Sequence, residues 1–160
     1  MNTYAGRLDG AGMRVAIVAS RFNDLVTERL VAGARDGLVR NGVDEASITL
    51  VWTPGAFELA VVARRLALSG DHDAIVCVGA VIRGTTDHYT HVATQCGAGL
   101  ARVALDTGVP VVFGVLTTDT TADALDRAGG KLGNKGYEGA VAAVEMVDLL
   151  RQLPKSAGSE

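Results

Sequence analysis

Apolar residues recur along the chain in two patterns that alternate with each other. Runs of consecutive apolar residues are typical of strands buried on both faces, and they predict strands over Met13–Ala19, Ile48–Trp52, Ala74–Ile82 and Val111–Leu116. Segments with an apolar residue every three or four positions predict helices. These helices run from Asp24 to the Asn41-Gly42 stop, over Ala56–Ser69, over His88–Asp106, from Thr120 or Thr121 to Arg127, and over Gly136–Gln152.

Strands that alternate with helices predict right-handed crossovers and a parallel sheet covered on both faces. We therefore expect an α/β fold, a three-layer α/β/α sandwich around a four-stranded parallel sheet with the flavodoxin-like order 2-1-3-4. No linker, repeat or low-complexity segment interrupts the chain, so residues 1–160 are expected to form a single domain. Residues 1–12 form an N-terminal arm and residues 154–160 a frayed tail in this interpretation.

The last predicted helix carries more apolar residues than one face of a sheet can cover. Its apolar positions spread around much of the helix and include Ala140, Val141, Val144, Met146, Val147, Leu149, Leu150 and Leu153. Because monomers rarely expose such surfaces, this pattern favours burial against another subunit.

Composition narrows the class of protein. Hydrophobic residues make up 48% of the chain and charged residues 21%, which is typical of a globular protein. The net charge of -3, without a basic block, argues against nucleic acid as a partner. No apolar run approaches the ~20 residues of a membrane helix, and residues 1–13 lack the pattern of a signal peptide, so a cytoplasmic location is expected. Cys77 and Cys96 are expected to be buried, reduced thiols.

Polar residues follow each predicted strand, and the carboxyl ends of parallel strands lie along one edge of a sheet. The richest of these segments is Arg83–His88, in which Gly84, Thr85 and Thr86 could hold a phosphate at a helix N-terminus. His88 could move a proton near neutral pH. The two threonines and Asp87 are also residues that cap helices, so both interpretations stay open.

Other residues at this edge also have two interpretations. Phe22 is either a cap on the core or a stacking platform for a flat ligand, and Glu58 either stabilises a helix dipole or accepts hydrogen bonds from a polyol. His88 and His91 lie three residues apart on one predicted helix face, but no third ligand of suitable spacing accompanies them. We therefore expect no metal site.

Taken in order, these segments resemble one family, the lumazine synthases, which catalyse the penultimate step of riboflavin synthesis. The matching segments are Arg21–Asn23, Pro54–Leu59, Gly79–His88, Gly114–Thr118, Asp126–Gly129 and Asn134–Gly136. The resemblance covers the chain from about Gly12 to Leu150. The chain departs from the family pattern at Ala60, where proline is frequent, and at Tyr89, where phenylalanine is common.

The resemblance implies a transferase that condenses 5-amino-6-(D-ribitylamino)uracil with 3,4-dihydroxy-2-butanone 4-phosphate to 6,7-dimethyl-8-ribityllumazine, without a cofactor or metal. It assigns proton transfer to His88 and binding of the butanone phosphate to Gly84, Thr85, Thr86 and Arg127. The residues that it assigns to the ribitylaminouracil are Phe22, Asn23, Ala56, Phe57, Glu58, Ala80, Val81, Ile82, Phe113 and Lys135. Phe113, Arg127 and Lys135 are expected to reach the site from a neighbouring subunit.

A site shared between subunits requires self-assembly, and the resemblance implies a homopentamer. An N-terminal strand at a subunit interface would then extend the sheet. The compact segment Gly129–Lys135, without an insertion, resembles the members that assemble twelve pentamers into a 60-subunit icosahedral shell. A riboflavin synthase is a further partner that the family allows.

Two alternatives remain on the same scaffold. One is a non-catalytic protein or storage shell that binds flavin or lumazine, and the other is a related riboflavin synthase that dismutates lumazine. The intact set of Thr86, His88 and Arg127 favours the synthase, because a binding protein need not keep proton-transfer and phosphate-binding groups together.

Overall fold

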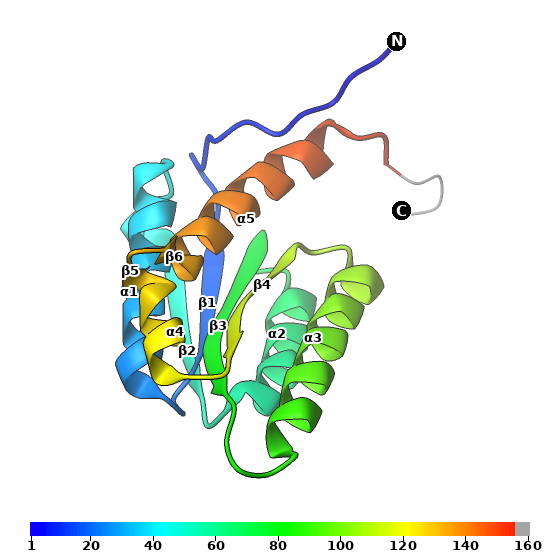
Figure 1. Cartoon of the computed structure of the whole chain (residues 1–160). Coiled ribbons are helices and arrows are strands. Elements are labelled where there is room, and N and C mark those ends of the chain that lie inside the picture. Colours follow the sequence, from blue (N-terminus) through cyan, green and yellow to red (C-terminus); the bar gives the residue numbers. More distant parts are fainter. Residues whose placement is uncertain (156–160) are drawn as a thin grey trace.

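The computed structural model describes residues 1–155 and shows a parallel sheet between two layers of helices (Figure 1). The strands are β1 (Val15–Ser20), β2 (Ile48–Thr53), β3 (Ala74–Ile82) and β4 (Val111–Thr118). They pair in parallel in the order β2-β1-β3-β4. The predicted flavodoxin-like α/β fold is therefore confirmed.

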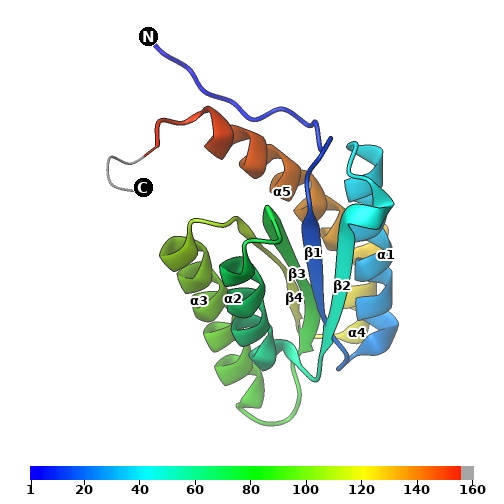
Figure 2. The same ribbon diagram turned by 180° about the vertical axis from the view of Figure 1, so that it is seen from behind.

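Helices cover both faces of the sheet. α1 (Asp24–Arg40) and α5 (Lys135–Gln152) pack together on one face, and α2 (Leu59–Ser69) and α3 (His88–Thr107) pack together on the other (Figures 1 and 2). The short helix α4 (Thr121–Asp126) follows β4.

Three short elements were not predicted from the sequence. A 3-10 turn, η1 (Glu45–Ser47), precedes β2, and another, η2 (Ala56–Glu58), forms the first turn of the predicted helix that α2 completes. Beyond α4 the chain folds into an antiparallel hairpin of β5 (Ala128–Gly130) and β6 (Gly133–Asn134) before α5 begins.

The core lies on both sides of the sheet because the inner strands are apolar on both faces. Every residue of β1 is buried. Ile17 belongs to the cluster beneath α1 and α5, whereas its neighbour Val18 belongs to the cluster beneath α2 and α3. This double burial explains why the strands are uninterrupted apolar runs instead of alternating patterns.

Most of the apolar surface of α5 is used within the chain. Ala140, Val144 and Val147 are buried in the core cluster that also contains residues of α1 and the sheet. A smaller set of apolar side chains on and just after this helix stays exposed, namely Met146, Leu150 and Leu153. The apolar surface that the chain itself leaves uncovered, which the sequence pattern indicates, is thus confined to the C-terminal half of α5 and to Leu153.

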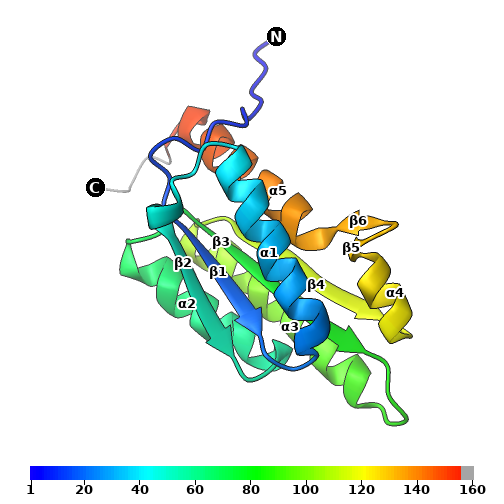
Figure 3. The same ribbon diagram turned by 90° about the vertical axis from the view of Figure 1, so that its left-hand side faces the viewer.

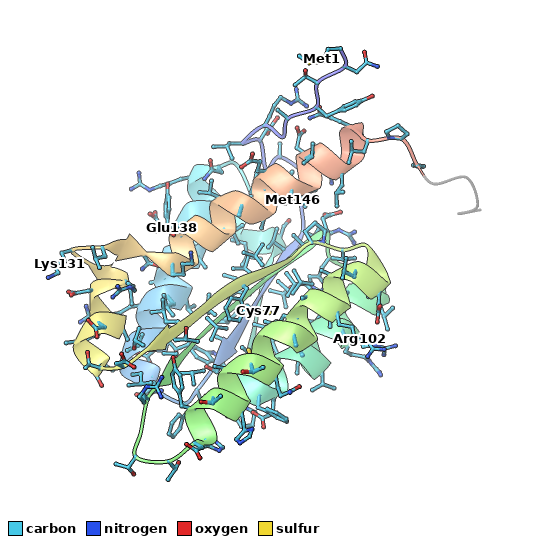
Figure 4. The ribbon with its side chains drawn as sticks, turned by 45° about the vertical axis from the view of Figure 1, so that its right-hand side comes forward. Met1, Cys77, Arg102, Lys131, Glu138 and Met146 are labelled. Carbon is cyan, nitrogen blue, oxygen red and sulfur yellow. The ribbon has the colours of Figure 1, made fainter. Side chains whose placement is uncertain are left out.

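Cys77 in β3 and Cys96 in α3 are free and buried, as predicted, and Figure 4 shows Cys77 in the middle of the molecule. Burial raises the pKa of the Cys96 thiol to about 11 and raises that of Cys77 further. Within residues 1–155, no helix combines the length and the apolar character needed to cross a membrane.

The N-terminal arm lies along the C-terminal half of α5 and forms no strand within residues 1–12, so its pairing with another subunit stays a prediction (Figure 1). The arm is tied to α5 at two points. The backbone N–H of Arg7 donates to Oδ2 of Asp148 at 2.8 Å, and its guanidinium donates to Oδ1 at 3.1 Å. Gln152 donates to the carbonyl of Ala5 at 2.8 Å.

Asp148 is 7% exposed, and the hydrogen bonds from Arg7 lower its pKa to about 2. At the other end of the chain, Pro154 and Lys155 follow α5 without regular structure. The rest of the predicted frayed tail, residues 156–160, lies outside the described residues.

We expect Asp148→Asn to release the arm from α5, because an amide cannot neutralise the Arg7 guanidinium that Asp148 holds. Hydrogen exchange at residues 5–9 should become faster in the variant. Because the pKa of Asp148 falls from 3.8 to about 2, the ion pair contributes fully above about pH 4, and its contribution is lost as the pH falls through about 2.

The matched control is Asp106→Asn, which removes an exposed carboxylate paired with Arg102 one helical turn away. This control should leave exchange in the arm unchanged. Equal exchange in wild type and Asp148→Asn would contradict the anchoring role of the ion pair.

Candidate active site

A cavity of about 650 Å³ opens at the carboxyl ends of β1, β2 and β3, which Figure 3 shows meeting at one edge of the sheet. Residues from four segments of the chain line it. Those among the predicted site residues are Phe22, Asn23, Ala56, Phe57, Glu58, Ala80, Val81, Ile82, Gly84, Thr86 and His88. The fold therefore brings together side chains that are up to 66 positions apart in the sequence.

Asn23 holds the loop after β1 in place. It adopts a left-handed backbone conformation, with φ of 62°, and no other non-glycine residue in the described part of the chain has a positive φ. Its side-chain amide donates to the carbonyl of Ala80 in β3 at 2.8 Å, and its own carbonyl accepts from the N–H of Thr27 at 3.0 Å. Asn23 thus ties the end of β1 to the end of β3 and starts α1.

The loop after β2 is ordered by Thr53, whose buried hydroxyl donates to the carbonyl of Gly55 at 2.9 Å. The N–H of Phe22 donates to the carbonyl of Pro54 at 3.2 Å, so the loops after β1 and β2 are joined. Phe22 and Phe57 are 73% and 57% exposed at this edge. The interpretation of Phe22 as a cap on the core is therefore wrong, and its ring is available for stacking.

The end of β3 supplies an apolar floor. Ala80 and Val81 are buried, and Ile82 is half-buried. Gly79 precedes them where no side chain fits, because the hydroxyl of Ser20 in β1 occupies the space that a Cβ would take.

Arg83 does not line the cavity. Its Nε donates to Oδ1 of Asp119 at 2.7 Å, and its guanidinium lies 4.4 Å from the ring centre of Tyr89. No lysine or arginine of residues 1–155 lines the cavity, and Glu58 is the acidic residue that does. Within residues 1–155 of a single chain, a negatively charged ligand in this cavity therefore has no lysine or arginine side chain to pair with.

In the first turn of α3, the N–H of Thr90 donates to the carbonyl of Asp87 at 3.1 Å, whereas the N–H groups of His88 and Tyr89 have no partner within the described residues. Asp87 stands at the N-cap position, but no side-chain hydrogen bond caps this helix in the described residues. The interpretation of Thr85, Thr86 and Asp87 as helix caps is thus wrong. Free N–H groups at a helix N-terminus attract anions. Both threonines of the loop are exposed, and Thr86 lines the cavity whereas Thr85 does not.

Three predicted site residues lie elsewhere. Arg127 and Lys135 line a second cavity of about 350 Å³ beside β4, together with Leu132 and Glu138. Phe113 in the edge strand β4 is 41% exposed, packs beside Gly97 of α3 and lines neither cavity. Figure 4 shows the hairpin, labelled at Lys131, and α3, labelled at Arg102, on opposite sides of the sheet.

The cavity also contains residues that the sequence analysis does not assign to a ligand, namely Pro54, Gly55, Tyr89, His91 and Val92. His91 is the one with further chemistry. The sequence feature that could have predicted it is the spacing of three residues between His88 and His91, which places both imidazoles on one side of α3. Within residues 1–155, no group of three or more His, Cys, Asp or Glu side chains could hold a metal ion.

A family model for 6,7-dimethyl-8-ribityllumazine synthase matches residues 12–151 of this chain. The chain belongs to this family. The lumazine synthase resemblance carried by the sequence motifs is confirmed, and with it a role as an enzyme of riboflavin biosynthesis. The matched range includes all four strands of the lumazine synthase sheet and every residue of both cavities.

We expect Asn23→Ala to lower the free energy of unfolding by about 1–2 kcal/mol, because alanine loses the bond to Ala80 and disfavours the left-handed backbone. Urea unfolding measures this loss. The control is Asn23→Gly, which loses the same hydrogen bond but accepts a positive φ, so its loss should be smaller. Equal stability of alanine variant and wild type would contradict the anchoring role of Asn23.

Proposed function

We propose that the larger cavity is the site at which this chain condenses 5-amino-6-(D-ribitylamino)uracil with 3,4-dihydroxy-2-butanone 4-phosphate to 6,7-dimethyl-8-ribityllumazine. The observation that carries the proposal is that this single cavity is lined by Phe22, Glu58, Thr86 and His88, together with the apolar end of β3. These side chains suit a flat ring, a polyol, a phosphate and a proton transfer respectively.

The pyrimidine ring would lie between the exposed ring of Phe22 and the apolar floor formed by Val81 and Ile82. Asn23, Ala56, Phe57 and Ala80 surround this position in the same cavity. The carboxylate of Glu58 would accept hydrogen bonds from the ribityl hydroxyls. A carboxylate suits this role because it offers acceptors only, and each hydroxyl of the polyol can donate.

The butanone phosphate would bind at the loop between β3 and α3. Gly84 and Thr86 line the cavity there, next to the free N–H groups and the positive dipole end of α3. Thr85 in the same loop joins them in this proposal. Because Asp119 and Tyr89 hold Arg83, the cationic partner of the phosphate would be Arg127.

The reaction forms an imine between the amine of the uracil and the ketone with loss of water, expels inorganic phosphate, and closes the second ring with loss of another water. Each of these steps moves a proton, and His88 stands at the start of α3, next to the phosphate loop and inside the cavity. Positioning two substrates side by side and transferring protons each contribute several orders of magnitude to such rates.

The second cavity supports a site completed by a neighbouring copy of the chain. Arg127 and Lys135 line a surface beside β4 that is separate from the cavity of His88, and Phe113 is exposed on the same edge strand. In a ring of five copies, this surface of one subunit would meet the cavity of the next, as heterologous contacts in closed rings do. Phe113, Arg127 and Lys135 would thus act across the interface.

We expect His88→Ala to lower kcat at least about tenfold through loss of proton transfer, and Arg127→Ala to raise the KM for the butanone phosphate about tenfold through loss of a charged hydrogen bond. Steady-state kinetics that follow lumazine absorbance measure both. Arg102→Ala, an exposed arginine on α3, is the control and should change neither constant. Wild-type protein that does not accelerate the spontaneous reaction would sink the proposed function.

Co-assembly of the two defective variants tests the shared site. When His88→Ala and Arg127→Ala chains mix in one ring, about a quarter of the interfaces pair an intact His88 with an intact Arg127 of the neighbour. Activity should therefore recover to about a quarter of the wild-type value. Mixed rings that stay as inactive as the separate variants would show that the two residues act within one chain.

The size of the assembly is a separate prediction. Five chains of 16.5 kDa make about 80 kDa and sixty make about 1 MDa, and we expect the larger, icosahedral particle because Gly129–Lys135 contains no insertion. Light scattering of the purified protein distinguishes the two sizes. A particle of about 80 kDa would agree with the pentamer and exclude the shell. A monomer would exclude both assemblies.

A further inference from the structure

The proposed mechanism leaves one imidazole of the cavity unused. His91 lines the cavity one helical turn beyond His88, so two of the three histidines of the chain lie there. Imidazole nitrogens can donate or accept hydrogen bonds, and the ring can carry a positive charge near neutral pH. Since neither lysine nor arginine lines the cavity within the described chain, these two rings are its cationic candidates.

The geometry of α3 shows toward which part of the cavity His91 points. The side of α3 that faces α2 is marked by Gly99, where a Cβ would lie 2.8 Å from the Cβ of Ala60. His88 stands on that side, eleven residues or about three turns before Gly99. His91 is turned by about 60° from His88 around the helix axis, away from the buried side that Cys96 and Leu100 mark.

Along the axis, His91 lies about 4.5 Å further than His88 from the loop Gly84–Thr86. The short turn η2, which carries Phe57 and Glu58, packs against α3. His91 is exposed at the mouth of the cavity on this side. It therefore lies on the side of the cavity away from that loop, and it lines the same cavity as Glu58.

The charge at this end selects between the two substrates. A phosphate placed beside the carboxylate of Glu58 would be repelled, whereas a neutral polyol would not. A polyol hydroxyl both donates and accepts, so a carboxylate that accepts and an imidazole that donates can bind neighbouring hydroxyls together. The pair of Glu58 and His91 matches a chain of hydroxyls better than either residue alone.

We propose that His91 is a specificity residue that binds the ribityl side chain of the uracil substrate, across the cavity from Glu58. This inference rests on the proposed function. It assigns His88 and His91 to different substrates, although they are one helical turn apart. His88 moves protons beside the phosphate loop, and His91 recognises the polyol.

Steady-state kinetics with both substrates test this assignment. His91→Ala should raise the KM for the ribitylaminouracil about fivefold, the worth of one hydrogen bond, and leave kcat and the KM for the butanone phosphate unchanged. His91→Gln keeps a side-chain donor and should recover most of the loss. The control is Thr90→Ala, which changes the neighbouring exposed residue that does not line the cavity.

A substrate analogue identifies the group that His91 contacts. With 5-amino-6-(ethylamino)uracil, which lacks the hydroxyls, wild type and His91→Ala should have the same KM. A fivefold difference that persists with this analogue would overturn the proposal, as would a rise in the KM for the butanone phosphate, a fall in kcat alone, or no change at all.

Calorimetric titration with the ribitylaminouracil alone separates this inference from the proposed function. If wild type binds the compound about fivefold more tightly than His91→Ala does, the role of His91 is supported whether or not turnover is observed. Equal binding by the two proteins overturns the role of His91 and leaves the proposed function intact. Absence of binding by wild type overturns both.

Discussion

Burial of the parallel strands on both faces is the constraint on which the rest of this structure depends. β1 has no exposed residue, and β3 is buried up to its last position. Strands of this kind bury few polar side chains, so most polar residues on this side of the sheet lie in the loops beyond the strand ends. Because every crossover returns the chain to the same starting edge, all four polar loops emerge together at the opposite edge.

Hydrogen bonds between the loops hold them around the cavity at this edge of the sheet. Asn23 links the end of β1 to β3, and the N–H of Phe22 links the same loop to the one after β2. These bonds leave the rings of Phe22 and Phe57 exposed instead of buried in the core. Exposed aromatic rings over an apolar floor are an energetic cost for an isolated chain, and in the proposed function the flat ring of a substrate would offset it.

Charge is divided between the two cavities. The larger one contains Glu58 and two histidines, whereas Arg127 and Lys135 line the smaller one beside β4. Arg83, the arginine nearest to the phosphate loop in sequence, is held by Asp119 and Tyr89. Binding of a phosphate ester and assembly of subunits are therefore linked in the proposed function, since the fixed positive charge lies on a separate surface of the chain.

The sequence by itself determined the class of fold, the four main strands to within about two residues, and the loops whose residues line the larger cavity, because periodicity and strand-end position are local properties. It also determined the family, whose motifs lie in those loops. Only the tertiary structure decided which side chains of a loop enter the cavity. Thr86 enters and Thr85 does not, and Arg83 turns toward Asp119, a residue 36 positions away. The arm along α5 rests on a bond between residues 141 positions apart, and His91 lines the same cavity as Phe22, which lies 69 positions earlier in the chain. Such contacts depend on the packing of distant segments, for which no single stretch of the sequence contains the information.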